Sequence, residues 1–336
     1  ASQRWAEQFS RTAVCPECHG KRLNREALSY RLDGRSIADF AEMDISELYA
    51  CLSDLEARLD KQRAAIAHEI LKELRTRLKF LLDVGLDYLS LSRATMSLSG
   101  GESQRIRLAT QIGSQLVNVL YILDEPSIGL HSRDTGRLIH VLKALRDLGN
   151  TVIVVEHDEE IMRAADYIVD IGPDAGRLGG RVVFAGPNPF AEGQAPSTDL
   201  PQQSTELPSY TLKYLSGEET IDVPSTRRSW TRSITVEGAR ANNLKGITVE
   251  FPLNVMTVVT GVSGSGKSTL VRSILYPALK RHFDEPADRP GEFLQLSGAV
   301  DAVKRVEFVD QHPIGRSSRS NPVTYLKAYD EIRKLM

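Results

Sequence analysis

The chain has 336 residues, of which 41% are hydrophobic and 26% are charged, and its formal net charge at pH 7 is −2. Its length and composition are those of a globular protein with two or three domains, and the balanced charge means that any contact with DNA would need a local basic patch. The sequence has no apolar run long enough to span a bilayer, no visible signal peptide and only three cysteines, so a disulfide framework is excluded and a cytoplasmic location is expected.

A Cys-x-x-Cys pair lies in the N-terminal region, residues 1–35, at Cys15 and Cys18. Two thiolates on one tight turn can occupy two corners of a zinc tetrahedron, but a closed structural site needs four ligands. His19 is more typical of a surface residue, and the sequence has no second Cys-x-x-Cys. We interpret the pair as a Zn²⁺ half-site, with a free dithiol as the alternative.

A helical region is predicted over residues 36–115. A helix start is expected at 44–48, and a long helix over 54–84 is indicated by apolar residues that recur at intervals of three, four or seven. These residues are Leu55, Leu59, Ile66, Ile70, Leu74, Leu78 and Leu81. Gly85 fits a C-cap, and we interpret the charged face of the helix as a solvated surface.

The LSGGE sequence at 98–102 is a small-residue turn that leads directly into a helix. Its glycines and serine leave backbone N–H groups uncovered at the positive end of that helix, which suits a phosphate group. Gln104, Arg105 and Arg107 alternate with apolar residues along the helix, so one face is polar and the other is packed.

Two buried strands are predicted over 119–123 and 151–155. The first ends in Asp124 and Glu125, and the second leads to His157. Because α/β sheets bind ligands at the carboxyl ends of their strands, these three side chains are candidates for a functional site.

A third strand over 167–171 and a hairpin strand over 181–185 complete a region that spans residues 116–186. Residues 187–232 are predicted to be a linker, because the first part is rich in Pro, Ser, Thr and Gln without any period. Its second part, 209–232, is expected to be weakly structured.

The last region, 233–336, is predicted to begin with strands over 233–238, 247–251 and 256–260. The third strand leads into GVSGSGKST at 261–269, a complete Gly-x-x-x-x-Gly-Lys-Ser/Thr sequence that is followed by a helical stretch. A strand before the motif and a helix after it are the context of a P-loop.

The P-loop predicts a nucleotide site. Backbone N–H groups of 264–268 would surround the α- and β-phosphates, Lys267 would reach the β- and γ-phosphates, and Ser268 would bind Mg²⁺. A final strand over 306–310 leads to Gln311.

Several of these motifs resemble those of ABC-type ATPases. LSGGE followed by Gln104 and Arg105 resembles the signature motif, and the strand that ends in Asp124 and Glu125 resembles Walker B. The positions of His157 and Gln311 match the γ-phosphate-sensing histidine and the Q-loop of that family. The resemblance implies an α/β fold, with a parallel core sheet, an antiparallel β subdomain and a helical signature subdomain.

The order of the motifs is signature, Walker B, histidine, P-loop and Q-loop, whereas an ABC cassette begins with its P-loop. The chain therefore looks like the back half of one cassette followed by the front half of the next. On this interpretation 36–115 is the helical signature subdomain, 116–186 the Walker B and histidine half of the first cassette, and 233–336 the P-loop and Q-loop half of the second.

Further motifs narrow the resemblance. They are CPECHGKRL at 15–23, LLDVGLDYL at 81–89, SIGLH at 127–131, DIGP at 170–173, NNLK at 242–245 and SSRSNPVTY at 317–325. Together, over nearly all of the chain outside 187–230, they resemble the UvrA family of excinuclease ABC components, so the chain looks like a central fragment of such a protein. The resemblance implies ATPase activity in the intact protein, homodimers, binding of damaged DNA and of UvrB in bacterial nucleotide excision repair, and no membrane partner.

The resemblance also assigns roles to residues. Glu125 would be the general base, His157 the γ-phosphate sensor, and Asp124, Ser268 and Gln311 the residues at Mg²⁺. Cys15 and Cys18 look like the second pair of a zinc module. The residues expected to bind ATP or ADP are Gly261, Ser263, Gly264, Ser265, Gly266, Lys267, Ser268, Thr269 and Gln311, together with Ser99, Gly100, Gly101 and Gln104 of a signature motif.

ABC sites form between cassettes, so Lys267 and Ser268 would face a signature motif, whereas Asp124, Glu125 and His157 would serve the P-loop of a first cassette. The alternatives are a nucleotide-binding fragment that does not hydrolyse ATP, two halves that complement one another as a permuted cassette, and a transporter-type ABC ATPase. The transporter is disfavoured because it would have one cassette in the usual order and no Cys-x-x-Cys before the signature. A structural-maintenance ATPase is also disfavoured, because it would need long coiled-coil arms between the halves. The predicted helix over 54–84 is too short for such an arm and lies before both halves.

Overall fold

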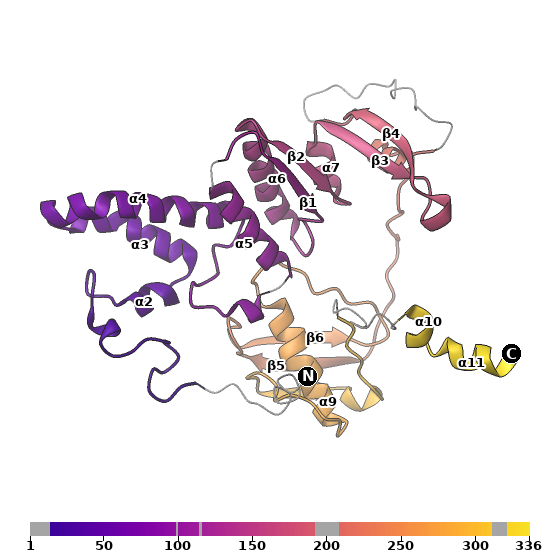
Figure 1. Cartoon of the computed structure of the whole chain (residues 1–336). Helices are drawn as coiled ribbons and strands as arrows, with labels where there is room; N and C mark the ends of the chain where they lie inside the picture. The colour runs from indigo at the N-terminus through magenta and orange to yellow at the C-terminus, as the bar shows by residue number, and fades with distance from the viewer. Residues whose placement is uncertain (1–13, 99, 114–115, 192–207, 311–320) are drawn as a thin grey trace. The chain divides into compact units, whose positions relative to one another are not determined.

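The computed structural model describes residues 14–98, 100–113, 116–191, 208–310 and 321–336 (Figure 1). The chain divides into two compact units: unit 1 comprises Ala1–Pro224 with Gly261–Gly264, and unit 2 comprises Ser225–Thr260 with Ser265–Met336. None of the helices among these residues is long and apolar enough to cross a membrane.

Unit 1 begins with the short helices η1 (Ala27–Ser29) and α2 (Ile37–Glu42) and then forms a helical hairpin from α3 (Ile45–Arg58) and α4 (Lys61–Asp83). The two long helices lie side by side (Figure 1). Ser36, Asp44 and Asp60 each accept a backbone hydrogen bond at a helix start, as N-cap residues do.

The prediction of one helix over 54–84 was wrong, because the helix is interrupted at Leu59 and Asp60 caps a new one. The predicted apolar stripe was also only partly correct. Leu55 and Leu78 are buried, but Ile66 and Ile70 are 69% and 60% exposed. The periodicity identified a helix correctly, but it combined residues of two helices into one stripe.

The central part of unit 1 has one apolar core. Its elements are η2 (Thr95–Ser97), α5 (Gly100–Gly113), β1 (Leu120–Asp124), α6 (Ser132–Asp147), β2 (Thr151–Val155) and α7 (Glu159–Ala164). Strands β1 and β2 pair in parallel, with Leu120 opposite Thr151 and Asp124 opposite Val155. Tyr121 of β1 and Leu138 and Leu145 of α6 are buried in the core, which also includes residues of α3 and α4.

Only one face of the β1–β2 sheet is covered in the described part of the chain. Side chains alternate between faces along a strand, and the face opposite the core leaves Ile122 and Ile153 67% and 47% exposed. Parallel sheets are normally covered on both faces, so this face is apolar without being packed.

The last part of unit 1 is a two-stranded antiparallel sheet, β3 (Tyr167–Gly172) with β4 (Arg181–Pro187), joined through η3 (Gly176–Leu178). Helix α8 (Tyr210–Ser216) packs on it, with Leu212 and Leu215 beside Ile168 and Phe184. The expectation that 209–232 would be weakly structured was therefore wrong for 210–216, since this helix is short but amphipathic.

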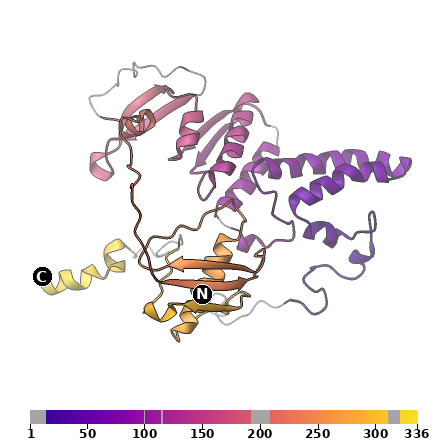
Figure 2. The same ribbon diagram turned by 180° about the vertical axis from the view of Figure 1, so that it is seen from behind.

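Unit 2 is built on an antiparallel sheet with the strand order β6 (Ile247–Pro252), β5 (Ser233–Ala239), β7 (Gln295–Gly298). A π-helical segment η4 (Thr269–Leu275) and helix α9 (Tyr276–His282) follow the P-loop, and Leu270 and Ile274 pack against Val236 and Ala239. Figure 2 shows the orange strands of this sheet from behind. The remaining helices are η5 (Val300–Ala302), α10 (Pro322–Tyr325) and α11 (Ala328–Leu335).

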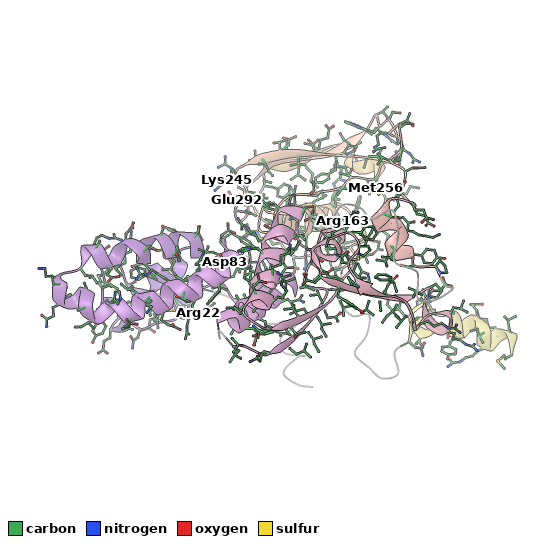
Figure 3. All side chains as sticks on the ribbon, turned by 90° about the horizontal axis from the view of Figure 1, so that it is seen from above. Arg22, Asp83, Arg163, Lys245, Met256 and Glu292 are labelled. Atoms are coloured by element: carbon green, nitrogen blue, oxygen red, sulfur yellow. The ribbon has the colours of Figure 1, made fainter. Side chains whose placement is uncertain are left out.

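The predictions of strands over 256–260 and 306–310 were wrong, because both segments are irregular. Met256, labelled in Figure 3, is 91% exposed, and Val309 is 93% exposed. A strand needs a neighbour for its backbone groups, and no strand of the described chain pairs with either segment.

Candidate nucleotide-binding and catalytic residues

The two carboxylates predicted to be functional lie at the C-terminal end of β1. Asp124 is its last residue, and Glu125 follows in a left-handed conformation with φ +45°. The Glu125 N–H donates to Val155 O at 2.9 Å, so the turn is attached to the end of β2. Both carboxylates are exposed and available to a ligand.

His157 follows β2 and lies next to Glu125, with 3.6 Å between His157 Nε2 and Glu125 Oε1. The imidazole is 82% exposed and the Glu125 side chain 48% exposed. The parallel pairing of β1 with β2 explains this proximity, because it brings the carboxyl ends of both strands to one edge. A carboxylate and an imidazole thus lie together at one edge of the sheet.

Gln104 of α5 also lies at this edge. Its Nε2 donates to the backbone O of Asp124 at 2.8 Å. This hydrogen bond fixes the helix that begins at the LSGGE turn relative to the carboxylates, which is a positioning contact that the sequence did not predict for Gln104.

Glu156 is a residue of this edge whose importance sequence reasoning missed. Its carboxylate accepts from Ser127 N at 2.7 Å, from Ser127 Oγ at 2.9 Å and from the N–H groups of His157 and Asp158 at 2.9 and 3.3 Å. Burial alone raises the pKa of Glu156, but these four hydrogen bonds outweigh it and lower the pKa. Glu156 therefore joins the loop after β1 to the loop that carries His157.

The start of α5 is held by a buried polar cluster. Tyr88 Oη donates to Glu102 Oε1 at 2.7 Å, and both Glu102 and Arg105 are buried. Arg105 reaches two backbone carbonyls, Gly101 O at 3.3 Å and Gly85 O at 3.5 Å. Burial, and then the hydrogen bond to Glu102, raise the pKa of Tyr88. Residues far apart in sequence supply these partners, so the LSGGE motif did not reveal them.

The glycines of this turn have a steric role in addition to the phosphate-binding role predicted from the motif. Gly100 begins α5, and a Cβ added to Gly101 would lie 2.7 Å from Ile128 O. Gly101 therefore lets the loop after β1 approach the helix closely. Ser99, which is also predicted to bind nucleotide, lies outside the described residues.

P-loop residues 265–269, which belong to unit 2, lead directly into a helical segment. Gly266 has φ +102°, and a Cβ there would lie 2.8 Å from Leu244 and 2.9 Å from Asn243. Leu270 N donates to Gly266 O at 2.9 Å, which closes the first helical turn over Lys267 and Ser268. Lys267 is half-buried and Ser268 is exposed, whereas Gln311 lies outside the part of the chain that the structure describes.

Comparison with known proteins gives a consistent result. A scan against protein-family models finds no match. The chain is 52% identical over 321 residues to UvrABC system protein A of Staphylococcus aureus strain Mu50, a match that covers 95% of this chain and 32% of that protein, and it is 51% identical to the Staphylococcus epidermidis protein. The crystal structure of UvrA2 from Deinococcus radiodurans superposes with a TM-score of 0.84 at 38% identity, over 99% of this chain and 40% of that one.

This chain corresponds to a segment of UvrA. It spans about one third of the length of the curated UvrA relatives it matches. The expected α/β fold, with a parallel sheet and antiparallel strands, is confirmed, and the described residues form one parallel and two antiparallel sheets.

The Cys-x-x-Cys turn is formed, but the described residues do not complete a zinc site. His19 N donates to Cys15 O at 2.8 Å and Lys21 N donates to Cys18 O at 2.9 Å. Hydrogen bonds from the backbone of Cys18 and of Glu17 and from the Cys18 side chain lower the pKa of Cys15. In the described chain no group of three His, Cys, Asp or Glu side chains could hold a metal ion, so this turn offers two thiols without further ligands.

The residues predicted to bind Mg²⁺ are of a donor type that suits this ion. Ser268 carries a hydroxyl and Asp124 a carboxylate, and Mg²⁺ prefers such hard oxygen donors. Both are exposed, Asp124 in unit 1 and Ser268 in unit 2.

Proposed function

We propose that the chain is the ATP-binding central part of a UvrA protein, where one ABC cassette ends and the next begins. The observation that carries the proposal is the second half of the P-loop, where Gly266 takes a left-handed conformation and Lys267 and Ser268 enter a helical turn. Identity of 52% to UvrABC system protein A over 95% of the chain supports it.

In this proposal Lys267 binds the β- and γ-phosphates, because it lies in a glycine-rich loop of the kind whose backbone N–H groups favour anions. The Ser268 hydroxyl contributes a ligand to Mg²⁺, which would neutralise phosphate charge when bound. In the same proposal Gln311 also contributes a ligand to Mg²⁺.

At the sheet edge of unit 1, Glu125 would accept the proton of the attacking water and His157 would contact the γ-phosphate. Asp124 would hold Mg²⁺ through water. The distance of 3.6 Å between His157 Nε2 and Glu125 Oε1 supports a shared task, because both side chains can reach one small ligand.

For the whole protein we propose the activity expected from the family. This is an ATPase of bacterial nucleotide excision repair that acts in the cytoplasm, forms homodimers, binds damaged DNA and loads UvrB. Zn²⁺ belongs to this proposal only with ligands beyond Cys15 and Cys18, since the described residues supply no complete set.

The test is MgATP binding by calorimetry, with turnover measured in parallel. Lys267→Ala is expected to weaken ATP binding at least 10-fold, because hydrogen bonds to charged groups contribute about 1.5–3 kcal/mol. Lys304→Ala removes an exposed lysine of the same unit and is the matched control, expected to bind as the unaltered chain does.

Turnover separates the alternatives. Binding that depends on Lys267 with negligible hydrolysis would support a nucleotide-binding fragment. Hydrolysis at the rate of a complete ABC ATPase, abolished in both Lys267→Ala and Glu125→Gln, would mean that the two halves complement one another. Unchanged ATP binding in Lys267→Ala would contradict the proposed function.

A further inference from the structure

The segment LLDVGLDYL at 81–89 has no role in the proposed function, although its Tyr88 contacts two motifs that do. The side chain of Tyr88 is half-buried and has two ends, an aromatic ring and a hydroxyl. Each end meets a different motif within unit 1, because this unit contains both the signature helix α5 and Gly261–Gly264, the first residues of the P-loop.

The ring of Tyr88 lies against the first half of the P-loop at Gly264. Gly264 has φ +77°, and a Cβ built on it would lie 2.5 Å from Cδ2 and from Cε2 of the Tyr88 ring. Only glycine fits here, because a residue with a Cβ is strained at this φ and has no room beside the ring. The ring therefore fixes the backbone of Gly264, the first of the residues whose N–H groups are expected to bind phosphate.

A second contact holds the residue before Gly264. Ser263 N donates a long hydrogen bond to Asp134 Oδ2 at 3.4 Å, and Asp134 is buried in the first turn of α6. Because buried side chains of a packed unit have little freedom to move, Asp134 holds Ser263 at a fixed place. Two consecutive residues of the P-loop are thus attached to unit 1, Ser263 by a hydrogen bond and Gly264 by contact with a ring.

The hydroxyl of Tyr88 meets the signature helix. Tyr88 Oη donates to Glu102 Oε1 at 2.7 Å, and Arg93 Nη2 lies 3.6 Å from Glu102 Oε2. Glu102 is buried, and a buried carboxylate is costly unless it is paired and hydrogen-bonded, so partners such as these hold it in place. The first turn of α5 is therefore fixed to the same side chain that supports Gly264.

We propose that Tyr88 is a positioning residue that links the first half of the P-loop to the signature helix. Its ring holds Gly264 in the conformation that receives phosphate, and its hydroxyl connects the position of that ring to Glu102 at the start of α5. Tyr88 acts through the backbone of the loop and touches no phosphate itself. This role rests on the proposed function, since it concerns the same nucleotide, and it adds that ATP on the P-loop orders the start of α5.

The first measurement is the affinity for MgATP, by calorimetry, of two Tyr88 variants. Tyr88→Leu removes the ring and the hydroxyl and is expected to weaken binding about 5-fold or more, because Gly264 loses the flat surface that fixes it. Tyr88→Phe keeps the ring and should bind within about 2-fold of the unaltered chain. Tyr210→Leu, at a position of α8 outside these contacts, is the control and should leave the affinity unchanged.

The second measurement separates positioning from a purely structural role. MgATP is expected to slow amide exchange about 3-fold or more in the peptide that covers the first turn of α5, because the ordered loop restrains Tyr88 and, through it, Glu102. Tyr88→Phe lacks the hydroxyl and should lose this response although it still binds ATP. A hydroxyl that only stabilises the fold would instead leave the response to MgATP unchanged in Tyr88→Phe.

A double-mutant cycle tests the contact between the ring and the loop directly. Gly264→Ala is expected to weaken MgATP binding about 10-fold, because the added Cβ meets the ring at a backbone conformation that already disfavours it. In the Tyr88→Leu background the same substitution should have less than about half of that effect, since the smaller side chain leaves room. With Tyr210→Leu the two factors should multiply.

Lys267→Ala distinguishes the two proposals, since a failure of that variant to weaken MgATP binding contradicts the proposed function itself. If Lys267→Ala weakens binding but Tyr88→Leu, folded by circular dichroism, binds as the unaltered chain does, the role of Tyr88 is overturned and the P-loop assignment stands. An unchanged response of α5 to MgATP in Tyr88→Phe, or simple multiplication of the Tyr88→Leu and Gly264→Ala factors, would overturn it as well. Should Tyr88→Leu not fold, the exchange result for Tyr88→Phe decides alone.

Discussion

The strands that carry the carboxylates and the segment that leads into the P-loop differ in how they are supported. Strands β1 and β2 pair with one another, and one face of their sheet packs on α6, so Asp124, Glu125 and His157 stand on a fixed edge. Residues 256–260 have a similar apolar, β-branched composition, but they have no partner strand in the described chain and stay irregular. Local composition thus makes a strand possible, and a neighbour makes it form.

The largest expected difference between the two regions is in hydrogen exchange. Amides of Ile153 and Val155 in β2 should exchange on the order of 1,000-fold more slowly than those of Val258 and Val259, because only the former face β1 in the parallel ladder, in the same phase as the Thr151 N–H that donates to Val119 O. Exchange measured by mass spectrometry with peptide resolution would show this. Comparable protection of both segments would mean that 256–260 pairs in solution, and the contrast would be lost.

The two faces of the β1–β2 sheet offer the next test. Leu138→Ala on α6 should reduce the free energy of unfolding by about 2–5 kcal/mol, because it opens a cavity under the sheet where Leu138 is 1% exposed. Ile122→Ala on the uncovered face should reduce the free energy of unfolding by less than about 1 kcal/mol. Urea unfolding followed by circular dichroism measures both, and similar losses would show that the exposed face is in fact packed.

Glu156 is expected to connect stability with pH. Glu156→Gln should reduce the free energy of unfolding by about 1–3 kcal/mol at pH 7, because the amide cannot accept all of the hydrogen bonds that the carboxylate receives. The pKa of Glu156 is lowered in the folded state, so its stabilisation is present above the unfolded pKa of about 4.3 and is lost as the pH falls through the lower folded value.

The difference in the free energy of unfolding between the unaltered chain and Glu156→Gln should therefore become smaller below about pH 4. Glu42→Gln, an exposed carboxylate of α2, is the control and should show no such dependence. A constant difference from pH 7 to pH 3 would contradict the role given to Glu156.

A smaller effect is expected at the start of the signature helix. Tyr88→Phe keeps the ring and removes the hydroxyl that donates to Glu102, at a cost of about 1 kcal/mol. Since the pKa of Tyr88 is raised in the folded state, this contribution is present below the unfolded value of about 10 and decreases as the pH rises above it. Thermal unfolding at pH 7 and pH 10.5 measures both parts of the prediction.

The sequence predicted the elements that local patterns determine. The strands at 119–123 and 151–155, the helix after Ser132 and the turn at Gly266 all follow from periodicity, caps and glycine chemistry. The resemblance to ABC-type ATPases assigned Glu125 and His157 to one site, and the structure brings the two side chains to 3.6 Å. The failures share a physical cause, which is dependence on distant partners. Residues 256–260 needed a neighbouring strand, and Glu156 and Tyr88 acquire their roles from residues 29 and 14 positions away.

The left-handed backbone at Glu125 has a consequence for how this position can vary. Most residues with a Cβ are strained at φ +45°, whereas Asn tolerates such a conformation better. Glu125→Asn should therefore stabilise unit 1 by about 0.5–1 kcal/mol in thermal unfolding while it removes the proposed general base, and a loss of stability would contradict this account. Selection for folding and selection for chemistry then act in opposite directions on one codon, so a library sorted only for stability should become depleted of glutamate at this position.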